Sequence, residues 1–302
     1  MPYLRLGAAQ VAIGAAAIFA RYALTGAGPL AVAAARLALA ALVLLALSRG
    51  LTRLSRRREL ALGLAGLALA LHFATWIASL EFTSVAVSTL LVTTTPLWTE
   101  IFDAVRERRA PSVAFVLSLV LGFAGVALVA AQRSSGAPPV PGHALLGDIL
   151  ALAGSFAIGA YLLIVRDTGA NSRGARLPTR DIVTRTYGWA ALVLVVTAGT
   201  ARQPPPAISD LVAWAGILAM ALVSQLLGHT ALNAALRDFR PSVVALSTLA
   251  EPVVAAVLAA IVFRELLGPA TIAGGVLVLA AVAITLATSR PASAETLTEL
   301  RG

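Results

Sequence analysis

The chain has 302 residues, of which 59% are hydrophobic and 12% are charged, and its mean hydropathy is +0.89. Soluble domains carry roughly 25% charged residues, so this composition excludes an ordinary water-soluble protein. All 23 basic residues are arginine, and they lie in short segments between apolar stretches without forming a nucleic-acid-binding tract or motif. The absence of cysteine excludes disulfide and thiol chemistry.

Apolar stretches of about twenty residues recur along the whole chain, and a helix of that length crosses a hydrocarbon core about 30 Å thick. They are rich in Leu, Ala and Val and show no alternation of period two, which favours helices over a β-barrel. The sequence predicts an all-α, polytopic membrane protein with ten transmembrane helices in the lipid bilayer. The expected spans are 5–25, 29–48, 59–80, 83–104, 111–131, 145–165, 181–200, 209–235, 240–262 and 268–288.

The arginines between the predicted spans are distributed unequally between the two sides of the membrane. Seventeen lie in segments on the side of the N-terminus, whereas three lie on the other side. Since positive residues concentrate in cytoplasmic loops, this distribution predicts a multi-pass protein with both termini in the cytoplasm. The first span alone also has the pattern of a secretory signal, but the repeat described next requires it as a helix.

An internal repeat divides the chain into halves of five spans each. Each half combines a mid-span Pro, an Arg-Glu pair at the end of that span and a Pro that opens the next. These elements are Thr95-Pro96, Arg106-Glu107 and Pro111 in the first half, and Glu251-Pro252, Arg264-Glu265 and Pro269 in the second. The predicted organisation is a first repeat at 1–132, an external Pro-rich linker at 133–144, a second repeat at 145–290 and a cytoplasmic tail at 291–302.

A lone arginine enters the second helix of each half, Arg36 in the first and Arg185 in the second. A repeat with an odd number of spans inserts in opposite orientations, so the halves are expected to be related by a pseudo-two-fold axis in the membrane plane. We therefore expect Arg36 and Arg185 near opposite membrane faces, as gate-side ion pairs or as residues that snorkel to the interface.

These features resemble the drug/metabolite transporter superfamily, and specifically its ten-helix EamA branch. The resemblance is carried by GDILALAGSFAIGAYLLIVR at 147–166 and EPVVAAVLAAIVFRELLGPATIAGGVLVLAAV at 251–282, while Thr95 replaces the acidic residue before Pro96 in the first repeat. It implies a secondary transporter that exports small metabolites across a bacterial inner (plasma) membrane by alternating access. Bacterial amino-acid exporters of the YddG type are one subgroup of this branch.

Polar residues at membrane depth are the candidate substrate-binding residues, because such groups are costly in lipid. On the third span, a face with spacing i, i+4, i+7 carries three of them. On the fourth, Pro96 loosens the helix, and Pro252 does so on the ninth, so both are predicted helix kinks. The candidates are His72, Trp76 and Ser79; Thr94, Thr95 and Trp98; Ser224, Gln225 and His229; and Ser247 and Glu251.

Glu251 is the most central acidic group, and an unpaired carboxylate at that depth would cost several kcal/mol. It is expected to be protonated, paired or bound to a cation such as a substrate ammonium. Alternatively, Glu251 is a structural hydrogen-bonding group that braces the kink at Pro252. The histidines can likewise bridge helices, and Ser or Thr can bond to their own backbone.

No enzyme motif, catalytic residue, cofactor site or metal-ligand spacing is present in the sequence. The function expected is export of amino acids, neutral or aromatic. Amphipathic drugs or nucleoside-like metabolites are the alternative cargo, and a channel or an intramembrane scaffold is the alternative to transport. Partners are the small-molecule substrate and the lipid bilayer; both proton coupling and facilitated exit stay open, and a monomer is expected with a dimer as the alternative.

Overall fold

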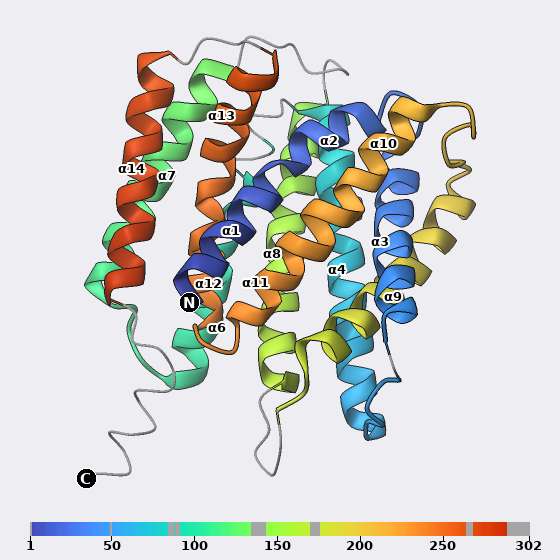
Figure 1. Ribbon diagram of the computed structural model, residues 1–302. Helices are drawn as coiled ribbons and strands as arrows, with labels where there is room; N and C mark the ends of the chain where they lie inside the picture. Colours follow the sequence, from blue (N-terminus) through green and yellow to red (C-terminus); the bar gives the residue numbers. More distant parts are fainter. Residues whose placement is uncertain are drawn as a thin grey trace.

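A computed structural model describes residues 2–48, 50–83, 88, 91–133, 143–169, 176–263 and 268–288, and these form a bundle of helices (Figure 1). The predicted external linker and the C-terminal tail lie largely or wholly outside these residues, as do Arg264 and Glu265. All regular secondary structure in the described part of the chain is helical, as the sequence predicted.

The first repeat contains α1 (Pro2–Gly14) and α2 (Ala16–Ala23), which together make the first span, then α3 (Pro29–Ala46) and α4 (Arg56–Phe82). The fourth span ends in α6 (Thr95–Glu107), and α7 (Val113–Arg133) is the fifth. Local signals begin these helices: Pro29 follows Gly28 in the first turn of α3, and the Ser55 side chain accepts a hydrogen bond from the Arg58 N–H of α4.

The second repeat contains α8 (Ala144–Gly169) and α9 (Thr179–Thr200). Its third span is α10 (Leu211–Ala219), a π-helix η1 (Met220–His229) and α11 (Thr230–Ala235) in continuous succession. Its fourth is α12 (Pro241–Ser247), a 3₁₀ turn η2 (Thr248–Ala250) and α13 (Glu251–Phe263), and its last is α14 (Pro269–Thr288). The chain therefore contains the ten spans predicted, several of them divided into shorter helices.

Six helices of the described residues are long and apolar enough to cross a membrane on their own. They are Pro2–Ala23, Pro29–Ala46, Arg56–Phe82, Ala144–Gly169, Thr179–Thr200 and Leu211–Ala235. Three further apolar stretches of the described residues are shorter: Val113–Leu128 in α7, Pro241–Ala255 across α12 and α13, and Ile272–Thr288 in α14. Large apolar side chains are exposed around the outside of the bundle, as expected for a surface that faces lipid; they include Leu42, Leu64, Leu71, Val120, Leu192 and Val196.

Helix pairing between the halves follows the predicted inverted repeat. The second spans of the two repeats, α3 and α9, pack against each other, and so do the fifth spans, α7 and α14. The third span of each repeat packs on the first span of the other: α4 packs on α8, and the segment from α10 to η1 packs on α1 and α2. In Figure 1, α1 and α2 rise through the bundle whereas α8 descends, so equivalent spans run in opposite directions.

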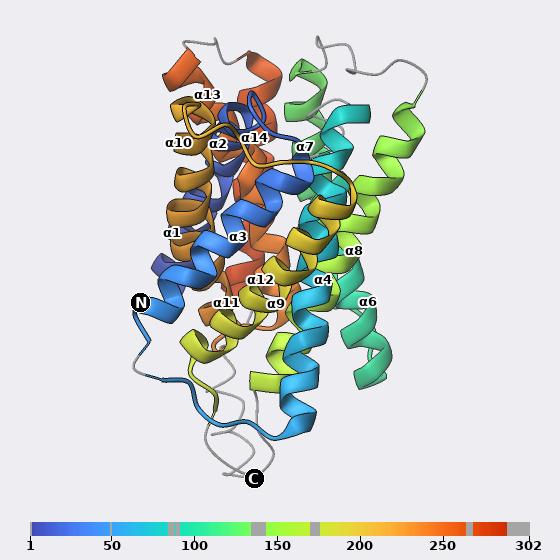
Figure 2. The same cartoon turned by 90° about the vertical axis from the view of Figure 1, so that its right-hand side faces the viewer.

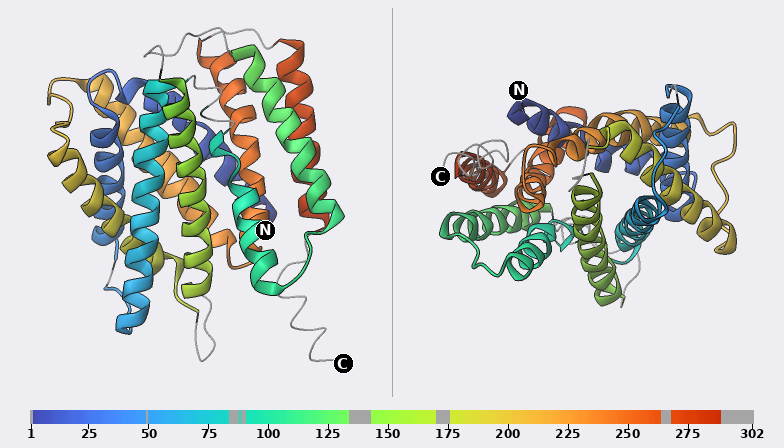
Figure 3. Two further views of the ribbon diagram at one scale, coloured as in Figure 1. Left: turned by 180° about the vertical axis from the view of Figure 1, so that it is seen from behind. Right: turned by 90° about the horizontal axis from the view of Figure 1, so that it is seen from below.

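One end of the bundle carries the arginine-rich connections, which we call the arginine face. It contains the segment before α4, the ends of α6, α8 and α11, and the start of α9, at the lower end in Figure 2. At this face α6 is tied to α8 by Arg106–Asp167 at 2.5 Å and Arg166–Asp103 at 3.4 Å. On one side of the bundle, α7 of the first repeat packs beside α13 and α14 of the second, and these three helices are clearest from behind (Figure 3).

Candidate functional site

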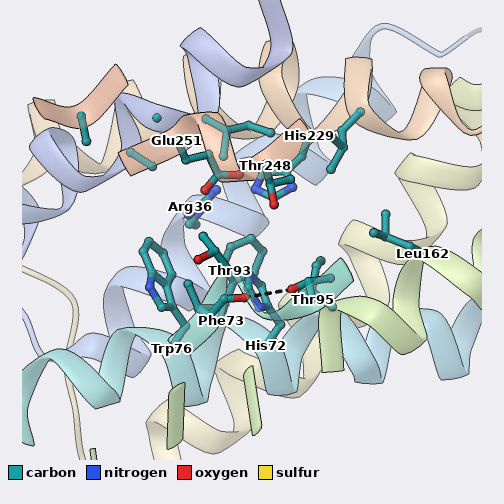
Figure 4. A pocket seen from close by; sticks show the side chains of 17 residues that line it. Arg36, His72, Phe73, Trp76, Thr93, Thr95, Leu162, His229, Thr248 and Glu251 are labelled. Carbon is teal, nitrogen blue, oxygen red and sulfur yellow. Dashed lines mark hydrogen bonds between the residues drawn. The ribbon is translucent and has the colours of Figure 1, made fainter. Parts of the chain in front are cut away.

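A central cavity lies where helices of both repeats meet. Its volume is about 80 Å³, and since a cavity needs roughly 10–15 Å³ to hold one water, it has room for a small solute or a few waters. Figure 4 shows its side chains converging from α3, α4, α13 and the π-helix. Its polar lining consists of Arg36, His72, Trp76, Thr93, Thr95, His229, Thr248 and Glu251.

Arg36 lies inside this cavity, and its position corrects the sequence-based expectation. The side chain is 0% exposed, although we expected it near a membrane face. Its Nη2 donates a 2.7 Å hydrogen bond to Gln225 Oε1, and its Cζ lies 4.2 Å from the centre of the Phe73 ring. The long side chain leaves α3 toward the opposite repeat and not toward the membrane surface. Arg36 is therefore the cation of the central site.

Arg185, the counterpart of Arg36, lies at the arginine face. Its Nε donates a 2.9 Å bond to Glu59 Oε2, and its Nη2 donates a 2.6 Å bond to the Thr52 carbonyl. Arg185 therefore forms an ion pair with Glu59 at this face. The two arginines are thus equivalent in sequence but differ in surroundings, because only Arg36 lies among side chains of the central cavity.

Glu251 is the first residue of α13 and lies beside Arg36 in the cavity, where Figure 4 shows their charged groups pointing toward one another. The first helix, α1, approaches the start of α13 closely at this level. A Cβ at Gly14 would lie 2.7 Å from Val254 Cβ and 3.2 Å from the Glu251 carbonyl oxygen. Glycine at position 14 therefore lets α1 pack directly against the start of α13.

An aromatic wall lies opposite this pair. His72 and Trp76 stack with ring planes 5° apart and centroids 6.1 Å apart, and His229 meets Phe73 edge-on at 5.4 Å. His72 Nδ1 lies 2.9 Å from the Gly154 carbonyl oxygen, which fixes the ring against α8. The wall offers flat apolar surface next to one cation and one carboxylate.

Several buried polar atoms around the cavity have no hydrogen-bond partner among the described residues. They are Nε and Nη1 of Arg36, Nε1 of Trp76, Nε2 of Gln225 and Nδ1 of His229. Leaving a buried donor unsatisfied costs about 1–3 kcal/mol, and more for a charged group. A polar ligand with acceptor oxygens would satisfy the Arg36 donors.

Helix breaks frame the cavity at both predicted proline positions. Pro96 lies in the first turn of α6, directly after a turn at Thr93–Thr94, and Pro252 follows the 3₁₀ turn that ends at Ala250. Both prolines begin a helical segment where their missing N–H is tolerated. The π-helix containing Gln225 and His229 is a third irregular segment at the site, and such segments are frequent at functional sites.

Five of the eleven candidate residues line the cavity: His72, Trp76, Thr95, His229 and Glu251. Gln225 lies behind it and holds Arg36. Ser79 bonds Ser88, Ser224 donates to the Ala12 carbonyl, and Ser247 accepts from Gln10 Nε2 at 2.8 Å. These contacts join helices.

Thr94 and Trp98 are not among the residues that line the cavity. Thr94 shares a 2.8 Å bond with Ser155, and Trp98 packs edge-on against Phe156, which is 46% exposed at the outside of the bundle. Trp98 is therefore outside the described lining of the cavity, although the sequence made it a candidate substrate-binding residue. Sequence reasoning missed Phe73, Thr93 and Thr248 as lining residues and misplaced Arg36, whose isolation inside a long apolar run was the available signal.

Among the described residues, no cluster of three or more His, Asp or Glu side chains could hold a metal ion. The fold and the site define a class: a polytopic helical membrane protein of two inverted repeats with a polar cavity at their junction. In such architectures the repeat interface is the place of substrate and coupling-ion binding.

The chain belongs to the EamA-like transporter family, whose model matches residues 3–131 and again residues 145–287. The two matches coincide with the two repeats. The protein is therefore a multi-pass membrane transporter of small molecules, from a family of transporters and not of enzymes.

A solved crystal structure whose name states no function has the same fold. It matches with a TM-score of 0.75 at 18% identity, over 94% of this chain and 95% of that one. No curated protein sequence matches the chain.

Proposed function

We propose that the protein exports amino acids, neutral or aromatic, across the inner membrane by alternating access. The observation that carries this proposal is the placement of Arg36 and Glu251 in one cavity beside an aromatic wall. Arg36 binds the α-carboxylate through one of its unpartnered nitrogens, Nε or Nη1, together with the second hydrogen of Nη2, and Glu251 binds the α-ammonium. The rings of Phe73 and Trp76 contact the side chain.

Bidentate binding explains why an arginine occupies this position. The planar guanidinium presents parallel N–H donors that match a carboxylate, and the bond to Gln225 fixes its plane without neutralising its charge. A zwitterion adds one charge of each sign to the site, so the net charge of the cavity stays the same when it binds. Binding and release of a zwitterion therefore leave the net charge of the central cavity unchanged on either side of the membrane.

Alternating access requires the two halves to rock about this cavity. The arginine face is cytoplasmic in this proposal, with both termini on that side. Export down the substrate gradient needs no ion, and Glu251 is the group that would carry a proton if export is coupled to one. A monomer contains the complete cavity.

A set of three related substrates in liposomes tests the proposal. Phenylalanine carries both charges, phenethylamine lacks the carboxylate, and 3-phenylpropionate lacks the ammonium. We expect the wild type to transport phenylalanine far faster than either analogue. Arg36→Gln should lower phenylalanine flux by about tenfold to a hundredfold, since hydrogen bonds to a charged group contribute about 1.5–3 kcal/mol. It should leave the slow flux of phenethylamine unchanged.

Arg185→Gln is the matched control, because it removes the equivalent arginine at the arginine face and leaves the cavity intact. Equal loss of flux in both variants would contradict a role for Arg36 in binding. The absence of protein-dependent flux across a panel of neutral, aromatic and cationic amino acids would reject amino acids as the cargo. A resistance screen with toxic drugs and nucleoside analogues then tests the alternative cargo.

A further inference from the structure

A second pocket, with a volume of about 340 Å³, opens at the arginine face below the central cavity. Four arginines from separate segments line it: Arg166 at the end of α8, Arg176 before α9, Arg237 after α11 and Arg240 before α12. Among the described residues of this lining, Glu107 is the only acidic one. The pocket therefore concentrates positive charge.

The charges of two of these arginines are not neutralised by a carboxylate of the described residues. Arg176 donates a 3.0 Å bond to the Arg237 carbonyl, and Arg237 donates a 3.2 Å bond to the Leu177 carbonyl. Both partners are neutral backbone groups. Arg166 and Arg240, in contrast, pair with Asp103 and Glu107. Arg176 and Arg237 thus leave a positive potential that favours an anion in the pocket.

The pocket and the central cavity are lined along the same two segments. On α8, Leu162 lines the cavity and Arg166 lines the pocket; Leu232 of α11 lines the cavity, and Leu236, directly after that helix, lines the pocket. Four residues of a helix rise about 6 Å, so about one turn separates the two spaces. At that level Tyr161 donates a 2.8 Å hydrogen bond to Asn233 Oδ1, which joins the two helices.

We propose that this pocket is the cytoplasmic vestibule of the transport path, where Arg176 and Arg237 capture the carboxylate of a substrate before it passes the Leu162–Leu232 layer. This proposal rests on the proposed function for the identity of the substrate. The vestibule attracts anions by long-range charge, while the central cavity recognises both charges of a zwitterion. The headgroup of an anionic lipid has the same chemistry, and the experiment separates the two sources.

The natural lack of cysteine makes a direct test simple. Thr179→Cys places one thiol in the pocket lining. Purified protein in a neutral detergent is labelled with an anionic and with a cationic methanethiosulfonate reagent. Relative to free cysteine, we expect the anionic reagent to be favoured by about tenfold in 0.01 M salt, and the preference to disappear in 1 M salt.

Adding Arg176→Gln and Arg237→Gln to Thr179→Cys should abolish the preference for the anionic reagent. The control is Arg57→Gln, which removes an exposed arginine of the same face that is not in the pocket lining. If Thr179→Cys alone shows no preference for the anionic reagent in low salt, the proposal is overturned. It is also overturned if adding Arg57→Gln reduces that preference as much as adding Arg176→Gln and Arg237→Gln does. This readout does not require transport, so it stands whether or not amino acids are the cargo.

Two additions to phosphatidylcholine liposomes identify the source of the carboxylate or phosphate. A transported amino acid at saturating concentration should slow labelling of Thr179→Cys, while the corresponding amine should not. Slowing by phosphatidylglycerol, with no effect of the amino acid, would assign the pocket to a lipid headgroup and overturn its role as a vestibule. A wild type that transports no amino acid contradicts the proposed function and not the anion preference of the pocket.

Discussion

Arg36 of the first repeat donates a 2.7 Å hydrogen bond to Gln225 of the second, and this bond spans the junction of the two halves at the central cavity. Gln225 belongs to the π-helix η1, where the helical register changes, and its own Nε2 has no partner among the described residues. The amide therefore orients the guanidinium while leaving its charge available.

Gln225→Leu should destabilise the protein and reduce transport together. Arg36 would lose its hydrogen-bond acceptor, and a bond to a charged group contributes about 1.5–3 kcal/mol. Thermal unfolding in detergent measures the first effect and liposome flux the second. Gln225→Glu provides the contrast: a direct ion pair with Arg36 should preserve stability but still reduce amino-acid flux, because the cation is then neutralised. Normal flux in Gln225→Glu would contradict the proposed role of Arg36.

Glu251→Gln tests proton handling. If Glu251 carries the coupling proton, wild-type export accelerates when a pH gradient is imposed, and the variant loses this acceleration. Flux is measured in proteoliposomes with and without the gradient. An unchanged gradient response in Glu251→Gln excludes Glu251 as the proton site, and the same flux at all gradients in the wild type indicates facilitated exit.

Glu107 predicts an acid-sensitive contact at the arginine face. Burial raises the pKa of Glu107, but hydrogen bonds from Arg109 and Arg240 outweigh burial and hold that pKa below its ordinary value of 4.5. The carboxylate therefore stabilises the fold above pH 4.5, and this contribution is lost as the pH falls through the lowered pKa. Glu107→Gln should lower the unfolding temperature at pH 7, with a difference from the wild type that shrinks below pH 4.5. A constant difference over pH 3–7 would contradict this assignment.

Gly216 predicts a packing defect on substitution. A Cβ at this position would lie 2.6 Å from the Ala23 nitrogen and 2.7 Å from the Phe19 carbonyl oxygen, and backbone atoms cannot easily move aside. Gly216→Ala should destabilise the α2–α10 contact by about 1–3 kcal/mol. Gly188→Ala is the control, because nothing lies within 4 Å of its Cβ position. Thermal unfolding of the two variants should differ; equal effects would contradict close packing at Gly216.

The proposed orientation predicts that a reporter fused after Gly302 is active only if it requires the cytoplasm. Ten spans put the C-terminus on the same side as the N-terminus, and the arginine distribution predicts that this side is the cytoplasm. A fluorescent protein that folds in the cytoplasm and a phosphatase that requires the periplasm are the paired reporters. Phosphatase activity of the C-terminal fusion would overturn the ten-span orientation.

The sequence by itself determined the helical class, the ten spans, the two repeats and two of the helix breaks, those at Pro96 and Pro252. Each depends on local chemistry: apolar length decides what can cross a bilayer, and a proline inside a span removes a backbone N–H, so a helical segment begins at it. The repeat also identified Arg36 and Arg185 as equivalent residues. It did not reveal that Arg36 lies in the central cavity while Arg185 pairs with Glu59 at the arginine face.

Only the tertiary structure decided which faces of the spans line the cavity. In a membrane the lipid side is as apolar as the packed side, so the periodicity of a span does not reveal its inward face. The direction of Arg36 depends on Gln225, which is 189 residues away in sequence, and Trp98 lies in the contact between α6 and α8, where it meets Phe156 and the Gly159 position. Long-range packing between inverted halves brought a cation, a carboxylate and an aromatic wall into one cavity.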